Sequence, residues 1–268
     1  MFLACAGVSL CYGEEDYIYF IYTTLINMAV GSGLILLGRG AENRVTRRDG
    51  YCIVAFTWLL FTGFGMLPFY ISGSIPSVTD AFFETMSGFT TTGATILDDI
   101  EALSHGMLFW RSFSQWIGGL GIVFFTIAVL PIFGVGNQVL FSAEATGVTH
   151  DKIHPKISVM AQCLWTVYLV LTVAEIVLLL IGGMDLFDAA CHAFSTTATG
   201  GYSTKQASVA YWNSPFIEYV IAIFMILSGI NFSLYFMCMK GRCGQLFKDG
   251  ELRLYLISIG AVTLIITG

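Results

Sequence analysis

The stretch TTTGAT, residues Thr90–Thr95, and its counterpart STTATGGYS, residues Ser195–Ser203, interrupt a very apolar chain. Each follows an apolar segment of about ten residues, which is too short to cross a bilayer, and longer apolar segments flank both. Irregular backbone at membrane depth is tolerated only where it is buried in protein or lines a water-filled path. The two stretches therefore predict loops that line a pore.

The composition indicates a membrane protein. Of 268 residues, 56% are hydrophobic and 11% are charged, whereas a soluble domain has about 25% charged residues. Several apolar runs reach the roughly 20 residues that span hydrocarbon, and the alternating pattern of an outer-membrane barrel is absent. The fold class predicted is an all-α polytopic membrane protein. The chain has no strongly basic surface, so nucleic acid is not an expected partner.

Segment lengths predict where the chain crosses the membrane. Val78–Ser87 and Leu186–Ser195 are half-membrane helices by length, and Met1–Tyr12 is also too short to span. Pro68 and Pro131 each fall near the end of a predicted span, where a bend or kink is expected. The predicted spans, the last of which only begins before the sequence ends, are Tyr17–Gly38, Tyr51–Ile71, Leu108–Val135, Val159–Gly182, Phe216–Met239 and Leu252–Ile266.

The positions of the charges predict the topology. Ten of the twelve Lys and Arg residues fall in three alternate loops, at residues 39–50, 136–158 and 240–253, while the remaining loops are mainly acidic. The positive-inside rule makes the three basic loops cytoplasmic. This holds only if each half-length helix and its Thr/Gly stretch enter from outside and return. The chain therefore reads twice as span, re-entrant half-helix with a filter-like loop, and span.

The two units are similar in sequence. Asp80-Ala81 matches Asp188-Ala189, and at the same offset Ser87, Thr91, Gly93 and Thr95 match Ser195, Thr199, Gly201 and Ser203. Alignment of Gly93 on Gly200 instead shifts the register by one, and the residues leave both registers open. Similarity at a fixed period indicates a repeated supersecondary unit.

The residue types of the loops suit a dehydrated cation. Backbone carbonyls supply oxygen ligands without a fixed charge that would trap the ion. Gly93, Gly200 and Gly201 lack Cβ and permit the dihedrals that aim successive carbonyls inward. Each preceding half-helix would point its partially negative C-terminal end at the path. Asp98, Asp99 and Glu101 would concentrate cations at the outer mouth, and hard oxygen ligands favour alkali cations.

Three segments resemble one family, the TrkH/TrkG potassium uptake proteins of the Trk/Ktr/HKT superfamily. Asp80–Thr95 is similar to their first pore loop, Trp110–Ile122 to the start of the following helix, and Ser195–Ser203 to their second pore loop. The resemblance implies a potassium-channel-like fold of four helix–pore-loop–helix repeats, K+ as the transported ion and no organic cofactor. It also implies a homodimer in the inner membrane of a bacterium, regulated by a cytoplasmic nucleotide-binding subunit of the TrkA type.

By this resemblance the chain is an N-terminal fragment with two of the four repeats. The implied domains are a helical pair with a truncated first helix (1–48), a first repeat (49–136), a cytoplasmic linker (137–158), a second repeat (159–240), and a cytoplasmic loop with the start of a third repeat (241–268). The implied K+ filter carbonyls are those of Thr90, Thr91, Thr92, Gly93, Thr196, Thr197, Ala198, Thr199, Gly200 and Gly201.

Three further residues have two interpretations each. Glu84 could tune the pore field or anchor its loop, and the anchor is favoured. Arg111 could pair with an outer-mouth carboxylate such as Asp98 or Asp99, with a structural role favoured over gating. Glu175 lies mid-span, where a carboxylate is functional by default, although a hydrogen bond to a neighbouring helix is equally expected.

Two other functions stay open. The chain could be a non-conducting assembly or regulatory subunit of a membrane complex. Less favoured is an intramembrane hydrolase, in which Ser87 would pair with His105 or His192. Gly118-Gly119-x-Gly121 could be read as nucleotide-binding glycines, but close helix packing is favoured because no strand precedes them.

Overall fold

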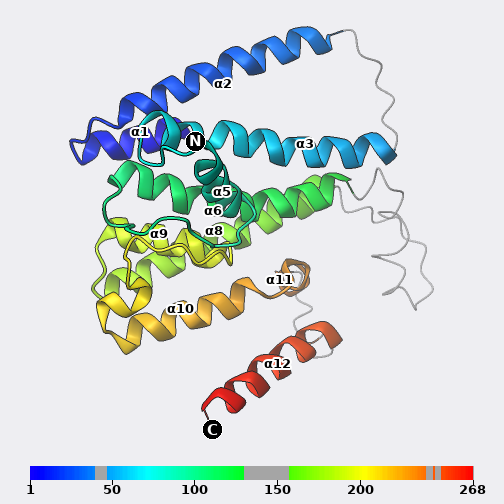
Figure 1. The fold of residues 1–268 in the computed structure, drawn as a ribbon. Helices are drawn as coiled ribbons and strands as arrows, with labels where there is room; N and C mark the ends of the chain where they lie inside the picture. Colours follow the sequence, from blue (N-terminus) through cyan, green and yellow to red (C-terminus); the bar gives the residue numbers. More distant parts are fainter. Residues whose placement is uncertain (40–46, 130–156, 240–243, 245–248, 268) are drawn as a thin grey trace.

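In the computed structural model the described residues, 1–39, 47–129, 157–239, 244 and 249–267, form helices joined by loops (Figure 1). Pro131 and most of the predicted linker, residues 137–156, lie outside this part of the chain. The elements in order are α1 (Phe2–Cys11), α2 (Tyr17–Gly38), α3 (Arg47–Gly65), α4 (Leu67–Ile71), α5 (Val78–Phe89), α6 (His105–Val129), α8 (Ile157–Ile181), α9 (Leu186–Thr197), the 3-10 helix η1 (Ser208–Trp212), α10 (Pro215–Ser228), α11 (Phe232–Met239) and α12 (Gly250–Thr267).

Two described helices are long and apolar enough to cross a membrane, namely α2 over Tyr17–Gly38 and α8 over Leu164–Ile181. The first has the bounds that its sequence predicts. Few of the residues in either segment are buried, and large apolar side chains of α2 such as Ile35 and Leu37 are exposed. A helix that is apolar all round suits hydrocarbon rather than water.

The bend predicted near Pro68 is confirmed. Helix α3 ends at Gly65 and α4 begins at Leu67, with Pro68 in its first turn. Because proline has no N–H, a continuous helix would lose a hydrogen bond at this point. The indole N–H of Trp110 donates to the Gly65 carbonyl at 3.0 Å. A side chain from α6 therefore satisfies a carbonyl at the end of α3.

The predicted span over Phe216–Met239 contains a break that the sequence did not predict. Helix α10 ends at Ser228 and α11 begins at Phe232. Tyr235 donates its hydroxyl to the Leu227 carbonyl at 2.7 Å, and Tyr255 reaches the Ile226 carbonyl at 3.3 Å. The two hydroxyls donate to carbonyls near the end of α10, where helical N–H partners are lost. These carbonyls therefore keep hydrogen-bond donors despite the break.

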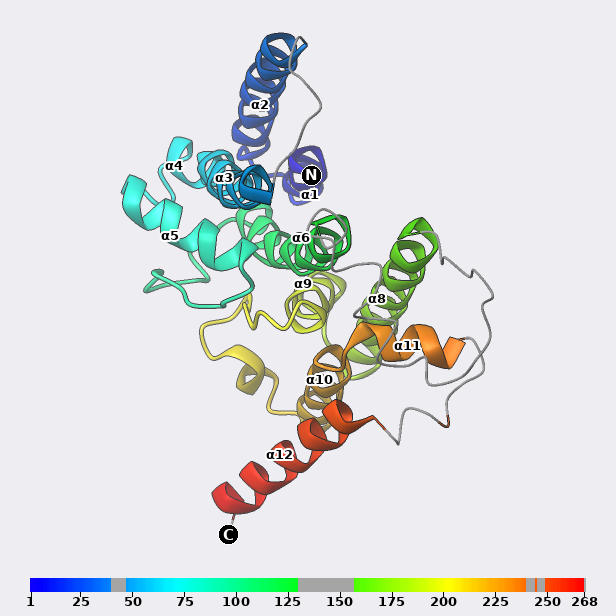
Figure 2. The same ribbon diagram turned by 90° about the vertical axis from the view of Figure 1, so that its right-hand side faces the viewer.

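The helices lie side by side, with α5 and α9 between longer ones (Figures 1 and 2). Helix α6 contacts α5 on one side and α9 on the other. The helix ends that adjoin the three basic segments all lie at the right of Figure 1, at the C-terminus of α2, α6 and α11 and the N-terminus of α3 and α8. The chain between α3 and α6, and between α8 and α10, leaves and returns at the opposite end. Each half-length helix and its loop therefore begin and end at the same end of the neighbouring long helices.

Candidate functional site

The two half-length helices are equivalent. Helices α5 and α9 each have 12 residues, and Leu186 begins the second 108 positions after Val78 begins the first. Side-chain oxygens of their N-cap residues, Ser77 and Asp185, accept at 3.4 Å from the backbone N–H of Asp80 and Asp188, respectively. The caps are therefore displaced by the same 108 positions as the helices.

The turns that follow the helices are also equivalent. The N–H of Thr91 donates to Gly88 at 3.0 Å, as that of Thr199 donates to Thr196 at 2.9 Å. The N–H of Thr92 likewise reaches the Ser87 carbonyl and that of Gly200 the Ser195 carbonyl. The offset of 108 is the structural register, and the alternative alignment of Gly93 on Gly200 is excluded.

Both loops use left-handed backbone at the same places. Gly93 has φ 76° and Gly201 has φ 90°, values that favour glycine because it lacks Cβ. Thr91 and Thr199 both have φ 55°, which costs a residue with a side chain about 1–3 kcal/mol and is found mainly at functional sites. The paired strain is therefore an observation that favours a functional loop.

The predicted filter residues fall into two groups by position. Thr90 and Thr92 of the first loop, and Thr199 and Gly201 of the second, are exposed on the loops, whereas Thr196 and Thr197 are buried. Thr196 and Thr197 belong to the last turn of α9 and are equivalent to Gly88 and Phe89 of α5. The segment equivalent to 90–93 is therefore 198–201.

A buried ion pair anchors the first loop. The Arg111 Nε lies 2.7 Å from Glu84 Oε1, with both side chains almost fully buried. The second carboxylate oxygen of Glu84 accepts from the Ile96 N–H at 2.9 Å and from the Thr95 hydroxyl at 3.0 Å. These contacts support the interpretation of Glu84 as an anchor of the first loop. Arg111 does not take an outer-mouth carboxylate as its partner, because α5 packs against α6 and brings Glu84 to it, and this buried pair agrees with the structural role that the sequence favours.

Arg111 also joins the two loops. Its Nη1 donates to the Ser203 carbonyl at 3.1 Å, and its guanidinium lies 4.1 Å from the centre of the Tyr202 ring. The Tyr202 hydroxyl in turn donates to the Glu84 carbonyl at 2.8 Å. One cation therefore ties the second loop to the first half-helix.

The second loop has a hydrogen-bonded histidine at the position where the first has the carboxylate of Glu84. His192 occupies the position equivalent to Glu84, and Ser203 the position equivalent to Thr95. The Nδ1 of His192 lies 2.8 Å from the Asp188 carbonyl, which can only accept, so Nδ1 carries the proton. Nε2 then accepts from the Ser203 hydroxyl at 3.0 Å.

The glycines of α6 allow close packing behind both loops. A Cβ on Gly118 would overlap the Phe89 carbonyl at the end of α5. A Cβ on Gly119 would lie 3.2 Å from Ala198 at the end of α9. The packing interpretation of this glycine run is confirmed, since α6 is the surface against which both half-helices end.

The remaining predicted residues make fewer hydrogen bonds to the two loops. Asp98 and Asp99 are exposed, and Asp99 accepts from the N–H of Glu101 at 3.1 Å. Glu175 is fully buried on α8, and neither of its oxygens has a hydrogen-bond partner among the described residues. The alternative of a hydrogen bond to a neighbouring helix is therefore not observed in this part of the chain, although the Thr196 and Thr197 hydroxyls lie near enough to act on the carboxylate.

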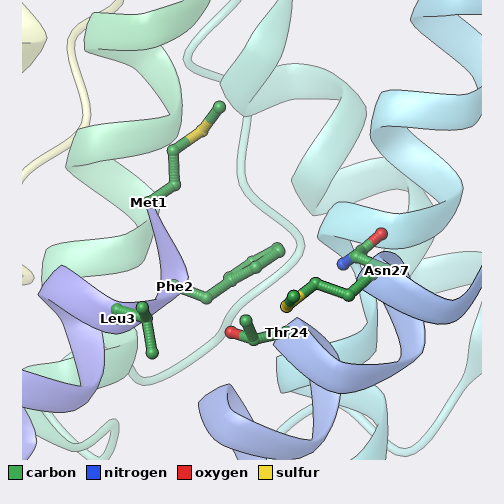
Figure 3. A pocket seen from close by; sticks show the side chains of 6 residues that line it. Met1, Phe2, Leu3, Thr24 and Asn27 are labelled. Atoms are coloured by element: carbon green, nitrogen blue, oxygen red, sulfur yellow. The ribbon is translucent and has the colours of Figure 1, made fainter. Parts of the chain in front are cut away.

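The Ser/His pair of the hydrolase alternative is not formed. The Ser87 hydroxyl donates to the Ala94 carbonyl at 2.6 Å. His105 pairs with Glu14 at 2.8 Å, and His192 bonds to Ser203. A hollow between α1 and α2, shown in Figure 3, is lined by Met1, Phe2, Leu3, Thr24, Asn27 and Met28, so no candidate filter residue lines it.

Sequence reasoning missed two residues of the site. Gln115 of α6 accepts from the Tyr202 N–H at 3.2 Å, so both residues belong to the junction between the loops. An amide side chain near Arg111 and Ser114 in a predicted span was the available sequence signal for Gln115. Tyr202 lies inside the second Thr/Gly stretch, but its hydrogen bond to Glu84 of α5 depends on the tertiary fold.

The helical fold defines the class, a polytopic helical membrane protein, here with two equivalent half-length helices and loops. The sequence profile of the TrkH family, described as cation transport proteins, matches residues 19–266. The chain belongs to this family.

Relatives give the same result. The chain is 42% identical over 252 residues to the Trk system potassium uptake protein TrkH of Escherichia coli K12, covering 93% of this chain and 52% of that protein. It is 36% identical over 259 residues to TrkG of the same strain, covering 95% and 53%. The crystal structure of the potassium transporter TrkH from Vibrio parahaemolyticus superposes with a TM-score of 0.83 at 36% identity, covering 96% and 52%. The chain therefore spans about half the length of the relatives it matches.

Proposed function

We propose that this chain forms two loops of the path of a potassium uptake protein, with backbone carbonyls of residues 90–93 and 198–201 as ion ligands. The observation that carries the proposal is the equivalence of the loops. Helix length, turn hydrogen bonds and left-handed positions all recur at an offset of 108 residues. Relatives named as potassium uptake proteins support K+ as the ion.

The second segment begins at Ala198 in this proposal. The Thr196 carbonyl already accepts the Thr199 N–H, so it is less free to bind an ion than the carbonyls that follow. Thr196 and Thr197 then support the loop from behind, as Gly88 and Phe89 do in the first. The C-terminal ends of α5 and α9 present their partially negative carbonyl ends to the same path.

The proposed assembly follows the family pattern. The loops face outward in a bacterial inner membrane, and the basic segments face the cytoplasm, where a TrkA-type nucleotide-binding subunit gates the path. Two copies form a homodimer, and further repeats complete the path because two loops cannot enclose it. The helix ends gathered on one side in Figure 1 support this orientation. The proposed domain bounds are 1–48, 49–136, 137–158, 159–240 and 241–268.

The test is ion flux in liposomes from the purified complete assembly, in which further repeats join this chain, with outward-directed gradients of K+ or Na+ and a membrane-potential dye as readout. The proposal expects K+ flux that exceeds Na+ flux at equal gradients. Flux without preference between the ions contradicts it, and absence of flux favours the non-conducting subunit. Loss of a proteolytic activity in Ser87→Ala would instead favour the hydrolase.

A further inference from the structure

Gln115 lies behind the point where the two loops meet. Its side chain is fully buried on α6. A Cβ on Gly200 would overlap its carboxamide, and a Cβ on Gly93 would lie 3.8 Å from its Nε2. The loops also touch each other here, because a Cβ on Gly93 would overlap the Gly200 carbonyl. The Gln115 side chain therefore lies directly against Gly200 of the second loop and near Gly93 of the first.

The carboxamide oxygen fixes the end of the second loop. Oε1 accepts from the N–H of Tyr202, the residue that follows Gly201, at 3.2 Å. Tyr202 carries this restraint to the first half-helix, since its hydroxyl donates to the Glu84 carbonyl. Gln115 Oε1 thus acts together with the Arg111 guanidinium to hold the second loop against the first half-helix.

The other half of the carboxamide has no such role. Gln115 Nε2 is buried and has no hydrogen-bond partner among the described residues. An unpaired buried N–H is destabilising, so stability alone does not favour an amide here. The feature that an apolar side chain of equal length would lack is the acceptor for the Tyr202 N–H.

We propose that Gln115 is a positioning residue that sets ion specificity by holding residues 90–93 and 198–201 at the spacing that suits K+. The inference rests on the proposed function of these loops. Discrimination between alkali cations depends on the number and placement of carbonyl dipoles, and a site held loosely by its supporting residues loses performance. Gln115 itself does not touch the ion.

The test compares three variants of the protein in liposomes. Gln115→Met keeps the length of the side chain but removes the acceptor, and the K+-to-Na+ flux ratio should fall about tenfold. Gln115→Glu keeps an acceptor oxygen and the shape, so it should hold the ratio within about threefold of wild type. Gln162→Met, at an exposed glutamine of α8, is the matched control and should leave the ratio unchanged.

The outcomes separate the inference from the function beneath it. Wild-type protein without K+-selective flux contradicts the proposed function. Selective wild-type protein with an unchanged ratio in Gln115→Met overturns the role of Gln115, and so does an equal loss in Gln115→Glu. If Gln115→Met does not elute as folded protein, Gln115→Asn withdraws the oxygen from Tyr202 with an amide retained, and an unchanged ratio there overturns the inference.

Discussion

The loop after α5 and the loop after α9 have the same backbone and different supports. Both follow 12-residue helices and place a threonine at φ 55°. In the first, Glu84 forms a buried ion pair with Arg111, whereas at the equivalent position of the second, His192 forms a hydrogen bond with Ser203, and the ion pair there joins Lys205 to Asp188 at 3.8 Å. The backbone path is therefore the shared requirement, and different side chains meet it.

The largest expected effect is on the charged anchor. Glu84→Gln leaves Arg111 buried without its carboxylate, which should lower the free energy of unfolding by about 3–5 kcal/mol. His192→Leu removes neutral hydrogen bonds and should cost about 1–3 kcal/mol. Thermal unfolding of the variants in detergent micelles measures both.

Glu101→Gln is the control for the charged anchor. Glu101 is exposed on the outer loop and accepts from the Gln206 N–H at 3.1 Å, which a glutamine oxygen can also do. Its melting temperature should equal that of wild type. If Glu84→Gln and His192→Leu have the same melting temperature, the two anchors do not differ in stability as described.

The two left-handed glycines should differ next. A Cβ on Gly93 would overlap the Gly200 carbonyl, whereas a Cβ on Gly201 meets nothing within 4 Å among the described residues. Gly201→Ala should cost only the left-handed strain of about 1–2 kcal/mol, and Gly93→Ala should cost more. Equal losses in chemical denaturation would show that the loops do not touch at Gly93.

Loss of the hydrogen bond between Tyr202 and Glu84 should have a smaller effect on stability. Tyr202→Phe removes the hydroxyl that donates to the Glu84 carbonyl, and about 1 kcal/mol of stability should be lost. Tyr219→Phe, at an exposed tyrosine of α10, should lose nothing. The two melting curves are compared directly. A Tyr202→Phe curve that overlays the control would show that this hydrogen bond does not stabilise the protein.

The smallest effect is a pH dependence of the contact between Glu14, which lies between α1 and α2, and the start of α6. Partial burial acts to raise the pKa of Glu14, but hydrogen bonds from His105 and Gly106 at the start of α6 outweigh it, and the pKa lies below its ordinary value. This contact therefore adds stability above the unfolded pKa, and the gain is lost as pH falls through the folded pKa. The N-cap of α10, Ser214, makes no side-chain capping bond.

Glu14→Gln tests this dependence. Wild-type protein should lose more thermal stability than the variant between about pH 5 and pH 3. Parallel melting temperatures across that range would mean that Glu14 has the same proton affinity in the folded and unfolded protein.

Local sequence patterns predicted the elements that local chemistry determines. Pro68 removes an N–H, so the break between α3 and α4 follows from the residue itself. The break between α10 and α11 could not be predicted in this way, because the Ile226 carbonyl accepts a hydrogen bond from Tyr255, which lies in α12. The sequence allowed Arg111 an outer-mouth partner for a related reason. Its partner Glu84 is set by the packing of α5 against α6, which no local pattern in the sequence records.

The register of the second loop illustrates the same limit. Two alignments of the glycines were possible from residue identity, and hydrogen bonds of the backbone decided between them. Within the candidate filter, the sequence placed Thr196 and Thr197 with the loop because they are threonines. Their place in the last turn of α9 depends on where the helix ends.

The central claim is that the two equivalent loops contribute carbonyls to one potassium path. The most direct test is the K+-to-Na+ flux ratio of the protein in liposomes with Gly93→Ala or Gly201→Ala. The account predicts that both substitutions lower the ratio, with the greater fall in Gly93→Ala. A wild-type ratio in both folded variants would contradict it.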